Sequence, residues 1–177
     1  QSPKTDEFAT HLIQDVHQLD LAHVPAIDWV YVLLSPSQST IEGYQQTYVD
    51  SFAPIVAALK QHPVQKIVVV SSTRVYGENK GERIDDESCI QPVDEQGRLL
   101  RQMEQLYQQA FPKQCIIIRP TGIYGTSVAR MIKLAEITQS YPQIHYSNRI
   151  HIDDLARFLA KLIHVEHPEN SYIVSNN

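Results

Sequence analysis

The stretch "KIVVVSSTRVYG", residues 66–77, decides the fold class. Four consecutive β-branched apolar residues lead directly into two serines and a threonine. Continuous rather than alternating hydrophobicity is typical of a strand buried on both faces, as in a parallel sheet. The pattern therefore predicts Ser71, Ser72 and Thr73 at the carboxyl edge of the sheet, where a hydroxyl can bind a substrate oxygen. The alternative is that these residues only cap the strand end, and the segment alone leaves both interpretations open.

Four other short apolar segments have the same character, and they alternate with longer segments of helical period. The predicted strands are residues 11–16, 28–34, 66–72, 115–120 and 171–176. The predicted helices are residues 39–61, 97–110, a segment that follows Ser127, and one that begins at Asp153 or Asp154. Pro54 should kink the first helix, because proline removes a backbone donor. Strands alternating with helices predict a doubly wound parallel α/β sheet with right-handed crossovers.

The length of 177 residues suits one domain, and we treat residues 1–177 as a single unit. A net charge of −5 without a basic cluster argues against nucleic acid as a partner. The apolar runs are too short to cross a bilayer, which argues against a membrane protein. Cys89 and Cys115 form neither a disulfide framework nor a metal-binding spacing, so we expect no metal and a cytoplasmic setting.

Four further segments flank this motif in a fixed order. "QDV" (14–16) and "DWVYVLLSP" (28–36) precede it, and "RPTGIYG" (119–125) and "NRIHIDDLARFL" (148–159) follow it. With "SSTRVYG", they make the chain, from about residue 12 to 174, resemble the NAD-dependent epimerase/dehydratase family of the extended short-chain dehydrogenases/reductases. The resemblance implies a Rossmann-like fold, NAD or NADP as cofactor, and a small-molecule substrate such as a nucleotide sugar. A homodimer is one assembly that it allows.

The resemblance also implies roles for individual residues. Ser72 matches the catalytic hydroxyl that binds the reacting oxygen of the substrate. The residues matched to the cofactor site are Asp15, which would contact the adenine, and Leu34, Ser35, Ser71, Pro120 and Ile123, which would lie along the rest of the cofactor. Tyr76 is expected to be structural, and Asp153 and Asp154 are expected to cap a helix.

One departure from the family concerns the chemistry. The family places a tyrosine and, four residues later, a lysine at the start of the helix after the polar loop, but here these positions hold Gln96 and Leu100. Glutamine cannot exchange a proton near neutral pH, and leucine offers neither charge nor donor. We therefore expect an atypical active site in which both replacements face the cleft. Tyr48 is the first choice if another residue acts as the acid.

A second departure concerns the nucleotide. A dinucleotide-binding fold needs a Gly-rich turn after its first strand, and the six glycines here form no such turn. We therefore expect the chain to be part of a longer polypeptide whose first βαβ unit is absent, with the strand at 28–34 left as an edge. The sequence does not distinguish NAD from NADP.

Two functional hypotheses from different classes follow. The first is an NAD(P)-binding oxidoreductase of the epimerase/dehydratase type with an altered active site. The second is a catalytically silent protein that binds a cofactor or metabolite as a sensor or subunit. A scaffold that binds no dinucleotide is a third reading, and it depends on the native chain starting at Gln1.

Overall fold

A parallel four-stranded sheet forms the centre of the protein. In the computed structural model, the described residues are 8–77, 80–125, 132, 136 and 148–176. The sheet has the order β1-β2-β3-β6 and all three pairings are parallel. Its strands are β1 (Trp29–Val32), β2 (Lys66–Val70), β3 (Cys115–Pro120) and β6 (Ser171–Val174). A separate parallel pair joins β4 (Gly122–Tyr124) to β5 (Arg149–His151).

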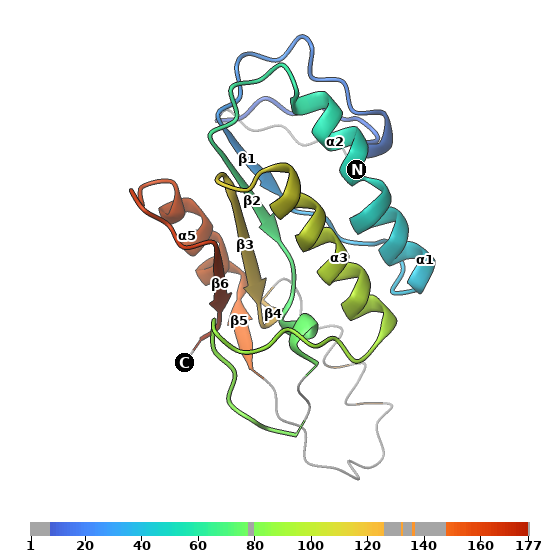
Figure 1. Cartoon of the computed structure of the whole chain (residues 1–177), viewed down its shortest axis with the longest axis vertical. Coiled ribbons are helices and arrows are strands. Elements are labelled where there is room, and N and C mark those ends of the chain that lie inside the picture. Colours follow the sequence, from blue (N-terminus) through green and yellow to red (C-terminus); the bar gives the residue numbers. More distant parts are fainter. Residues whose placement is uncertain (1–7, 78–79, 126–131, 133–135, 137–147, 177) are drawn as a thin grey trace.

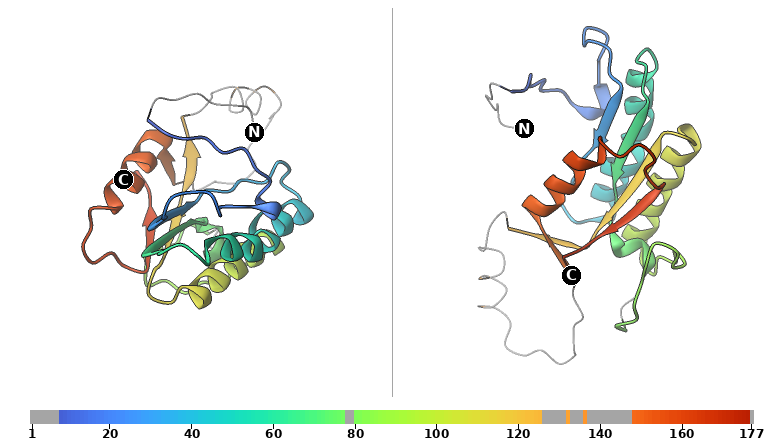
Figure 2. Two further views of the ribbon diagram at one scale, coloured as in Figure 1. Left: turned by 90° about the horizontal axis from the view of Figure 1, so that it is seen from above. Right: turned by 90° about the vertical axis from the view of Figure 1, so that its left-hand side faces the viewer.

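Helices cover both faces of this sheet. On one side lie α1 (Ile41–Tyr44), α2 (Phe52–Leu59) and α3 (Glu95–Ala110), and on the other lies α5 (Ile152–Leu162) (Figures 1 and 2). Each face has its own apolar cluster, one including Ile67, Val69 and Ile117, the other Val68, Ile116 and Ile118. Successive residues of β2 and β3 therefore point into opposite clusters, which is why their sequences are continuously apolar. The predicted doubly wound α/β class is confirmed.

The first predicted helix is interrupted rather than simply kinked. A π-helical segment, η2 (Gln45–Asp50), lies between α1 and α2. Pro54 has no N–H to donate to the carbonyl of Asp50, four residues earlier, and the α-helical ladder restarts with the bond from Ile55 N to Ser51 O. The break in the helix is thus a change of helical type just before the proline.

The predicted strand at residues 11–16 is wrong. In the described part of this segment there is no strand, and a 3₁₀ turn, η1 (Val16–Gln18), follows Asp15. Leu12 and Ile13 are both more than half exposed. A β-strand needs a neighbour for its backbone groups, and these residues have none among the described strands. The predicted helix after Ser127 lies outside the described residues, apart from Ile132 and Glu136.

The two edges of the sheet differ. Within the described chain, β1 has β2 as its single neighbour, and Leu33 just beyond it is 59% exposed. At the opposite edge, the outward N–H of Ile173 in β6 donates to the Asp86 carboxylate at 2.7 Å. Asp86 belongs to the polar loop before α3, so this loop closes one edge. The expectation that residues 28–34 form an exposed edge is confirmed.

Candidate functional site

Two serines follow β2 at the carboxyl edge of the sheet. The N–H of Ser71 donates to the carbonyl of Ile118 at 2.7 Å, so the backbone pairing with β3 continues to this residue. The Ser71 side chain is buried, yet its hydroxyl has no hydrogen-bond partner among the described residues. A buried hydroxyl without a partner is costly, because burial removes its bonds to water. Ser71 therefore presents an unused hydrogen-bonding group at the place where open α/β sheets bind ligands.

Ser72 begins the 3₁₀ turn η3 (Thr73–Tyr76). Its side-chain oxygen accepts the N–H of Arg74 at 3.2 Å and so caps the turn. The residue is half-buried. A hydroxyl can accept and donate at the same time, so capping leaves the Ser72 O–H able to donate to a further acceptor. The structural and functional interpretations of Ser72 are therefore compatible.

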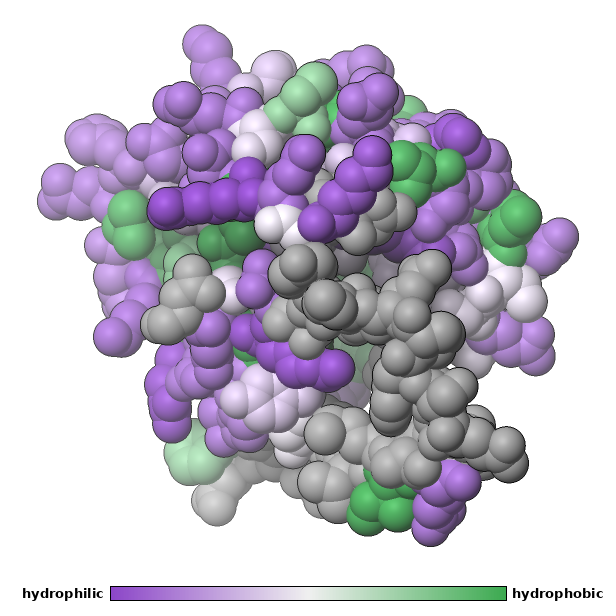
Figure 3. Space-filling view, turned by 90° about the horizontal axis from the view of Figure 1, so that it is seen from below, coloured by the Kyte–Doolittle hydropathy of each residue, from purple (hydrophilic) through white to green (hydrophobic). Residues whose placement is uncertain are grey.

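Two adjoining polar cavities open beside this turn. The first, about 390 Å³, lies between η3, the loop after it and the start of β5, and its lining includes Thr73, Thr121 and Asn148. The second, about 550 Å³, lies under the polar loop, and Tyr76 and Arg83 line both. Seen from the carboxyl end of the strands, the described surface is mainly hydrophilic (Figure 3). The edge predicted to bind a ligand thus has polar space for one.

A buried ionic network supports the wall of these cavities. Arg119 in β3 donates to both oxygens of Glu104 in α3, each at 2.9 Å, and to the hydroxyl of Tyr76 at 2.9 Å. Glu104 also accepts from Arg101 at 2.9 Å. Burial raises the pKa of Tyr76, so its phenol stays protonated near neutral pH. Tyr76 is held as part of the wall, in keeping with its expected structural role.

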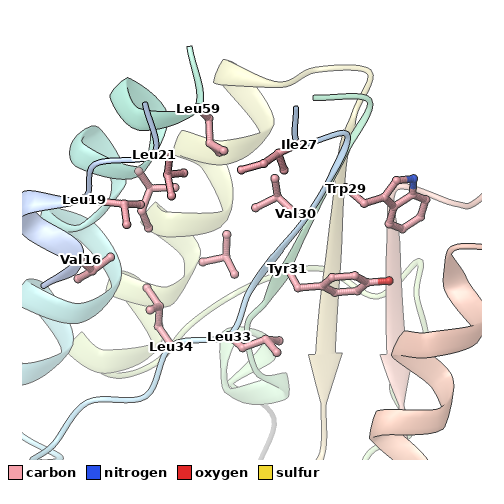
Figure 4. Close-up of a pocket in the computed structure, with 12 residues that line it drawn as sticks. Val16, Leu19, Leu21, Ile27, Trp29, Val30, Tyr31, Leu33, Leu34 and Leu59 are labelled. Carbon is pink, nitrogen blue, oxygen red and sulfur yellow. The ribbon is translucent and has the colours of Figure 1, made fainter. Parts of the chain in front are cut away.

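An apolar pocket of about 400 Å³ surrounds the open edge of β1. Figure 4 shows Trp29 and Tyr31 pointing to one side of the strand and Val30 to the other, toward η1 and α2. Leu34 lines this pocket together with Val16. Because strands β1 and β2 pair in register, Leu34 and Ser35 follow β1 at the same edge of the sheet as Ser71.

Asp15 lies next to that pocket, before Val16. Its carboxylate accepts the backbone N–H of His17 at 2.9 Å and contacts the His17 ring at 3.0 Å. Both contacts lower the pKa of Asp15, and the hydrogen bond from the His17 backbone N–H contributes most. The side chain is still 63% exposed, so the carboxylate remains accessible to a ligand.

The remaining predicted cofactor residues lie at the end of β3. Pro120 is buried and closes that strand, beside the strand that leads into Ser71. Ile123 lies in β4, in the smaller sheet, and is 47% exposed. The structure thus brings Leu34, Ser35, Ser71 and Pro120 to one edge, whereas the described contacts do not join Ile123 to them.

The positions of the family's tyrosine and lysine hold structural side chains. Leu100 is 2% exposed and packs in the core with Val69 and Val75. The expectation that Leu100 faces an open cleft is therefore wrong, because α3 turns this residue toward the sheet. Gln96 is half-buried and accepts a hydrogen bond from Arg74. Tyr48 is a poor substitute acid, since burial raises its pKa to about 12 and its hydroxyl faces the carbonyl of Leu34 at 3.5 Å.

The last helix begins one residue earlier than expected. His151 caps α5 by accepting the N–H of Asp153 at 3.2 Å, so Asp153 and Asp154 lie in the first turn. Asp154 pairs with Arg157 at 2.7 Å. All of these side chains have structural partners.

Within the described ranges, no group of three or more His, Cys, Asp or Glu residues could hold a metal ion. No described helix is long and apolar enough to span a bilayer.

The residues present fit a dinucleotide. The unpartnered Ser71 hydroxyl and the accessible Asp15 carboxylate offer a donor and an acceptor, and Leu34 offers an apolar surface. A parallel sheet with helices on both faces and hydroxyls beyond its carboxyl edge defines a Rossmann-like α/β domain.

The chain belongs to the NAD-dependent epimerase/dehydratase family, whose model matches residues 15–174. No curated protein sequence matches it. A solved structure of a candidate NAD-dependent epimerase/dehydratase from Methylobacillus flagellatus is 34% identical, with a TM-score of 0.67 over 77% of this chain and 50% of that one.

Two other solved structures share the fold at lower identity. The UDP-glucuronic acid 4-epimerase from Bacillus cereus, in complex with NAD, is 18% identical, with a TM-score of 0.73 over 93% of this chain and 59% of that one. TunA, an NAD-dependent NDP-hexosamine 5,6-dehydratase, is 18% identical, with a TM-score of 0.72 over 92% of this chain and 59% of that one. The chain therefore spans between half and three fifths of the length of these three structures.

Sequence reasoning missed two features of the site. One is the Glu104–Arg119 pair, although a glutamate on the apolar stripe of a helix is a signal for a buried partner. The other is the set of bonds that Arg74 makes with Asp94 and Gln96, which are 20 and 22 residues away. No local pattern marks those contacts.

Proposed function

We propose that this chain is the larger part of an NAD(P)-binding oxidoreductase domain of the epimerase/dehydratase type, with an altered proton-transfer site. Its substrate would be a small hydroxyl-bearing molecule of the nucleotide-sugar kind. The observation that carries the proposal is the buried, unpartnered hydroxyl of Ser71 beside the half-buried hydroxyl of Ser72. Both free cysteines suit a reducing, cytoplasmic setting.

The proposed roles follow from where the side chains lie. Ser71 and Asp15 would bind the dinucleotide, with Leu34, Ser35 and Pro120 along it and Ile123 near the substrate end. When bound, the dinucleotide would supply the hydride-accepting chemistry. Ser72 would donate its hydroxyl hydrogen to the reacting oxygen of the substrate, held in place by the capping bond from Arg74.

We also propose that this chain belongs to a longer polypeptide, in which a further βα unit completes the fold. Its strand would pair with the open edge of β1, and its apolar side chains would fill the pocket around Val30 and Leu34. The turn after that strand would supply the backbone amides for the pyrophosphate. Residues 1–177 alone should therefore bind NAD(H) or NADP(H) only weakly, at millimolar levels or not at all.

Ser71 gives the sharpest test of cofactor binding. In the intact polypeptide, Ser71→Ala should weaken NAD affinity by about three- to tenfold, the value of one neutral hydrogen bond. The same change should leave the stability of the free protein unchanged or slightly raised, because it removes a buried hydroxyl without a partner. Calorimetric titration and urea denaturation measure the two effects separately.

Ser51 provides the matched control. It is also fully buried, but its hydroxyl donates to the carbonyl of Thr47 at 2.6 Å. Ser51→Ala should lower stability by about 1 kcal/mol and leave NAD affinity unchanged. Intact polypeptide that binds neither NAD nor NADP would overturn the proposal.

A catalytically silent binding protein is the second candidate. It is favoured by Leu100, whose place in the core removes the usual cation, and by Gln96, whose side chain has structural partners. Incubating the NAD-loaded intact polypeptide with a panel of UDP-sugars, followed by product analysis, separates the two. Cofactor binding without conversion of any sugar supports the silent protein.

A further inference from the structure

The carboxamide of Gln96 is held between two partners of opposite hydrogen-bonding character. Its oxygen accepts from the guanidinium of Arg74 at 2.5 Å, and its nitrogen donates to the backbone carbonyl of Ser39 at 2.9 Å. Arginine can only donate and a carbonyl can only accept. Rotating the amide by 180° would therefore break both bonds, and its orientation is fixed.

Arg74 is the centre of this arrangement. Its Nε donates to both oxygens of Asp94 at 3.0 Å, and its Nη2 lies 2.9 Å from Asp94 Oδ2. Its guanidinium carbon lies 6.0 Å from the centre of the Tyr44 ring. Asp94 in turn caps α3 by accepting the N–H of Gly97 at 2.7 Å. One side chain thus ties together the turn after β2, the start of α3 and the end of α1.

The backbone of Arg74 contacts the Ser72 side chain. Its N–H is the donor that Ser72 accepts, so the residue that anchors α3 also holds the Ser72 hydroxyl. Gly97 allows the close approach, because a Cβ there would lie 3.1 Å from the carbonyl oxygen of Arg74 and 3.0 Å from Pro92. A side chain at this position would push the helix away from the turn.

From these contacts we infer that Arg74 is a positioning residue. Its side chain holds Gln96 in one orientation and joins the turn after β2 to α1 and α3, and we call this set of contacts between Arg74, Asp94 and Gln96 the fastener. The fastener thereby fixes the direction of the Ser72 hydroxyl. The position that carries the proton-transferring tyrosine in the family has become part of this fastener. The inference rests on the proposed function, since it assigns Ser72 its ligand-facing role. The inference has a second consequence. Gln96→Tyr together with Leu100→Lys should break the fastener and disrupt the core instead of restoring proton transfer.

The side-chain amide signals of Gln96 test the fastener directly. In the ¹⁵N spectrum of the intact polypeptide, they should be displaced and protected from exchange, unlike those of the exposed Gln102, Gln105 and Gln109 on the same helix. Arg74→Met should move the Gln96 signals to the positions of the exposed glutamines. It should also speed hydrogen exchange of the backbone amide at position 74 by tenfold or more, which reports the loss of the fixed Ser72 contact.

Arg98→Met is the matched control. Arg98 is an exposed arginine in the first turn of α3, close in sequence to Gln96, and it pairs with Glu95 at 3.0 Å. This variant should leave both readouts unchanged. In a double-mutant cycle, Arg74→Met and Gln96→Met should be coupled by about two- to tenfold in the unfolding equilibrium constant, and Arg98→Met with Gln96→Met should not.

Gln96 signals that coincide with those of the exposed glutamines in the parent protein would overturn the inference. So would Gln96 signals, or position-74 exchange, that do not change in Arg74→Met. NAD titration of the same samples keeps the two proposals apart. Failure to bind NAD refutes the proposed function and leaves the fastener standing, whereas normal NAD affinity with an unrestrained Gln96 amide refutes the fastener alone.

Discussion

At the scale of single residues, Glu104 and Arg119 matter most for stability. Both are almost fully buried. Arg119 is compensated by Glu104, whereas Glu104 has Arg101 as a second, partly exposed partner. Removing one partner of such a pair leaves a buried charge unpaired and typically costs about 3–5 kcal/mol. Arg119→Met leaves Glu104 with Arg101 as its ion-pair partner and should therefore destabilise the protein by up to about that amount in urea denaturation.

Replacing both partners gives the control for this prediction. Glu104→Met with Arg119→Met removes both charges and should recover a large part of the loss, because an apolar pair of similar volume can substitute for a buried ion pair. A double variant as unstable as Arg119→Met alone would show that the Tyr76 bond, rather than the unpaired charge, accounts for the loss.

A second prediction at this scale concerns acid. The hydrogen bond from Arg74 is the main cause of a lowered pKa for Asp94, helped by the N–H of Gly97 and the charge of Arg98. A carboxyl group with a lowered pKa stabilises the fold above its ordinary pKa of about 4, and the stabilisation is lost as the pH falls through the lower, folded-state value.

The measurement is the melting temperature of the parent and of Arg74→Met between pH 2 and pH 7. The difference between them should be constant above about pH 5 and should shrink below about pH 4. A difference that stays constant down to pH 2 would mean that Asp94 contributes through its cap alone.

At the scale of elements, α3 gives the clearest test of burial. Met103 is 1% exposed and lies among the core residues, whereas its neighbour Gln102 is exposed. Met103→Asp should destabilise the fold by several kcal/mol, about 3 or more, because it buries a charge without a partner. Gln102→Asp, one position away on the outer face, should change the melting temperature by no more than about two degrees.

The elements also show what the sequence can predict. Residues 66–70 and 115–120 were predictable as strands because burial on both faces leaves a continuous run of β-branched residues. The shorter apolar segment in residues 11–16 misled, because a strand also depends on a neighbour that no local pattern reveals. Leu99 and Met103 followed from helical spacing, although Leu106 is only half-buried.

The candidate site was less predictable than the fold. The hydroxyls of Ser71 and Ser72 could be found from the end of a strand. The role of Gln96 could not, because it depends on Arg74 and Ser39, which are 22 and 57 residues away. Hydrogen bonds over such distances leave no periodic signal in the sequence.

At the scale of the whole molecule, the carboxylate of Asp86 has a consequence for how copies of the chain can associate. Since it occupies the outward N–H of Ile173, the four-stranded sheet formed by the described residues has one edge open to pairing, at β1. A molecule with one unpaired sheet edge can form a dimer but nothing larger, whereas a molecule with two unpaired edges can form polymers of unlimited length. Self-association of residues 1–177 should therefore end at dimers, as light scattering at increasing concentration can show. Asp86→Ala frees the edge at β6 and should turn dimers into growing polymers. One carboxylate thus sets the number of copies that a molecule can bind through its sheet edges.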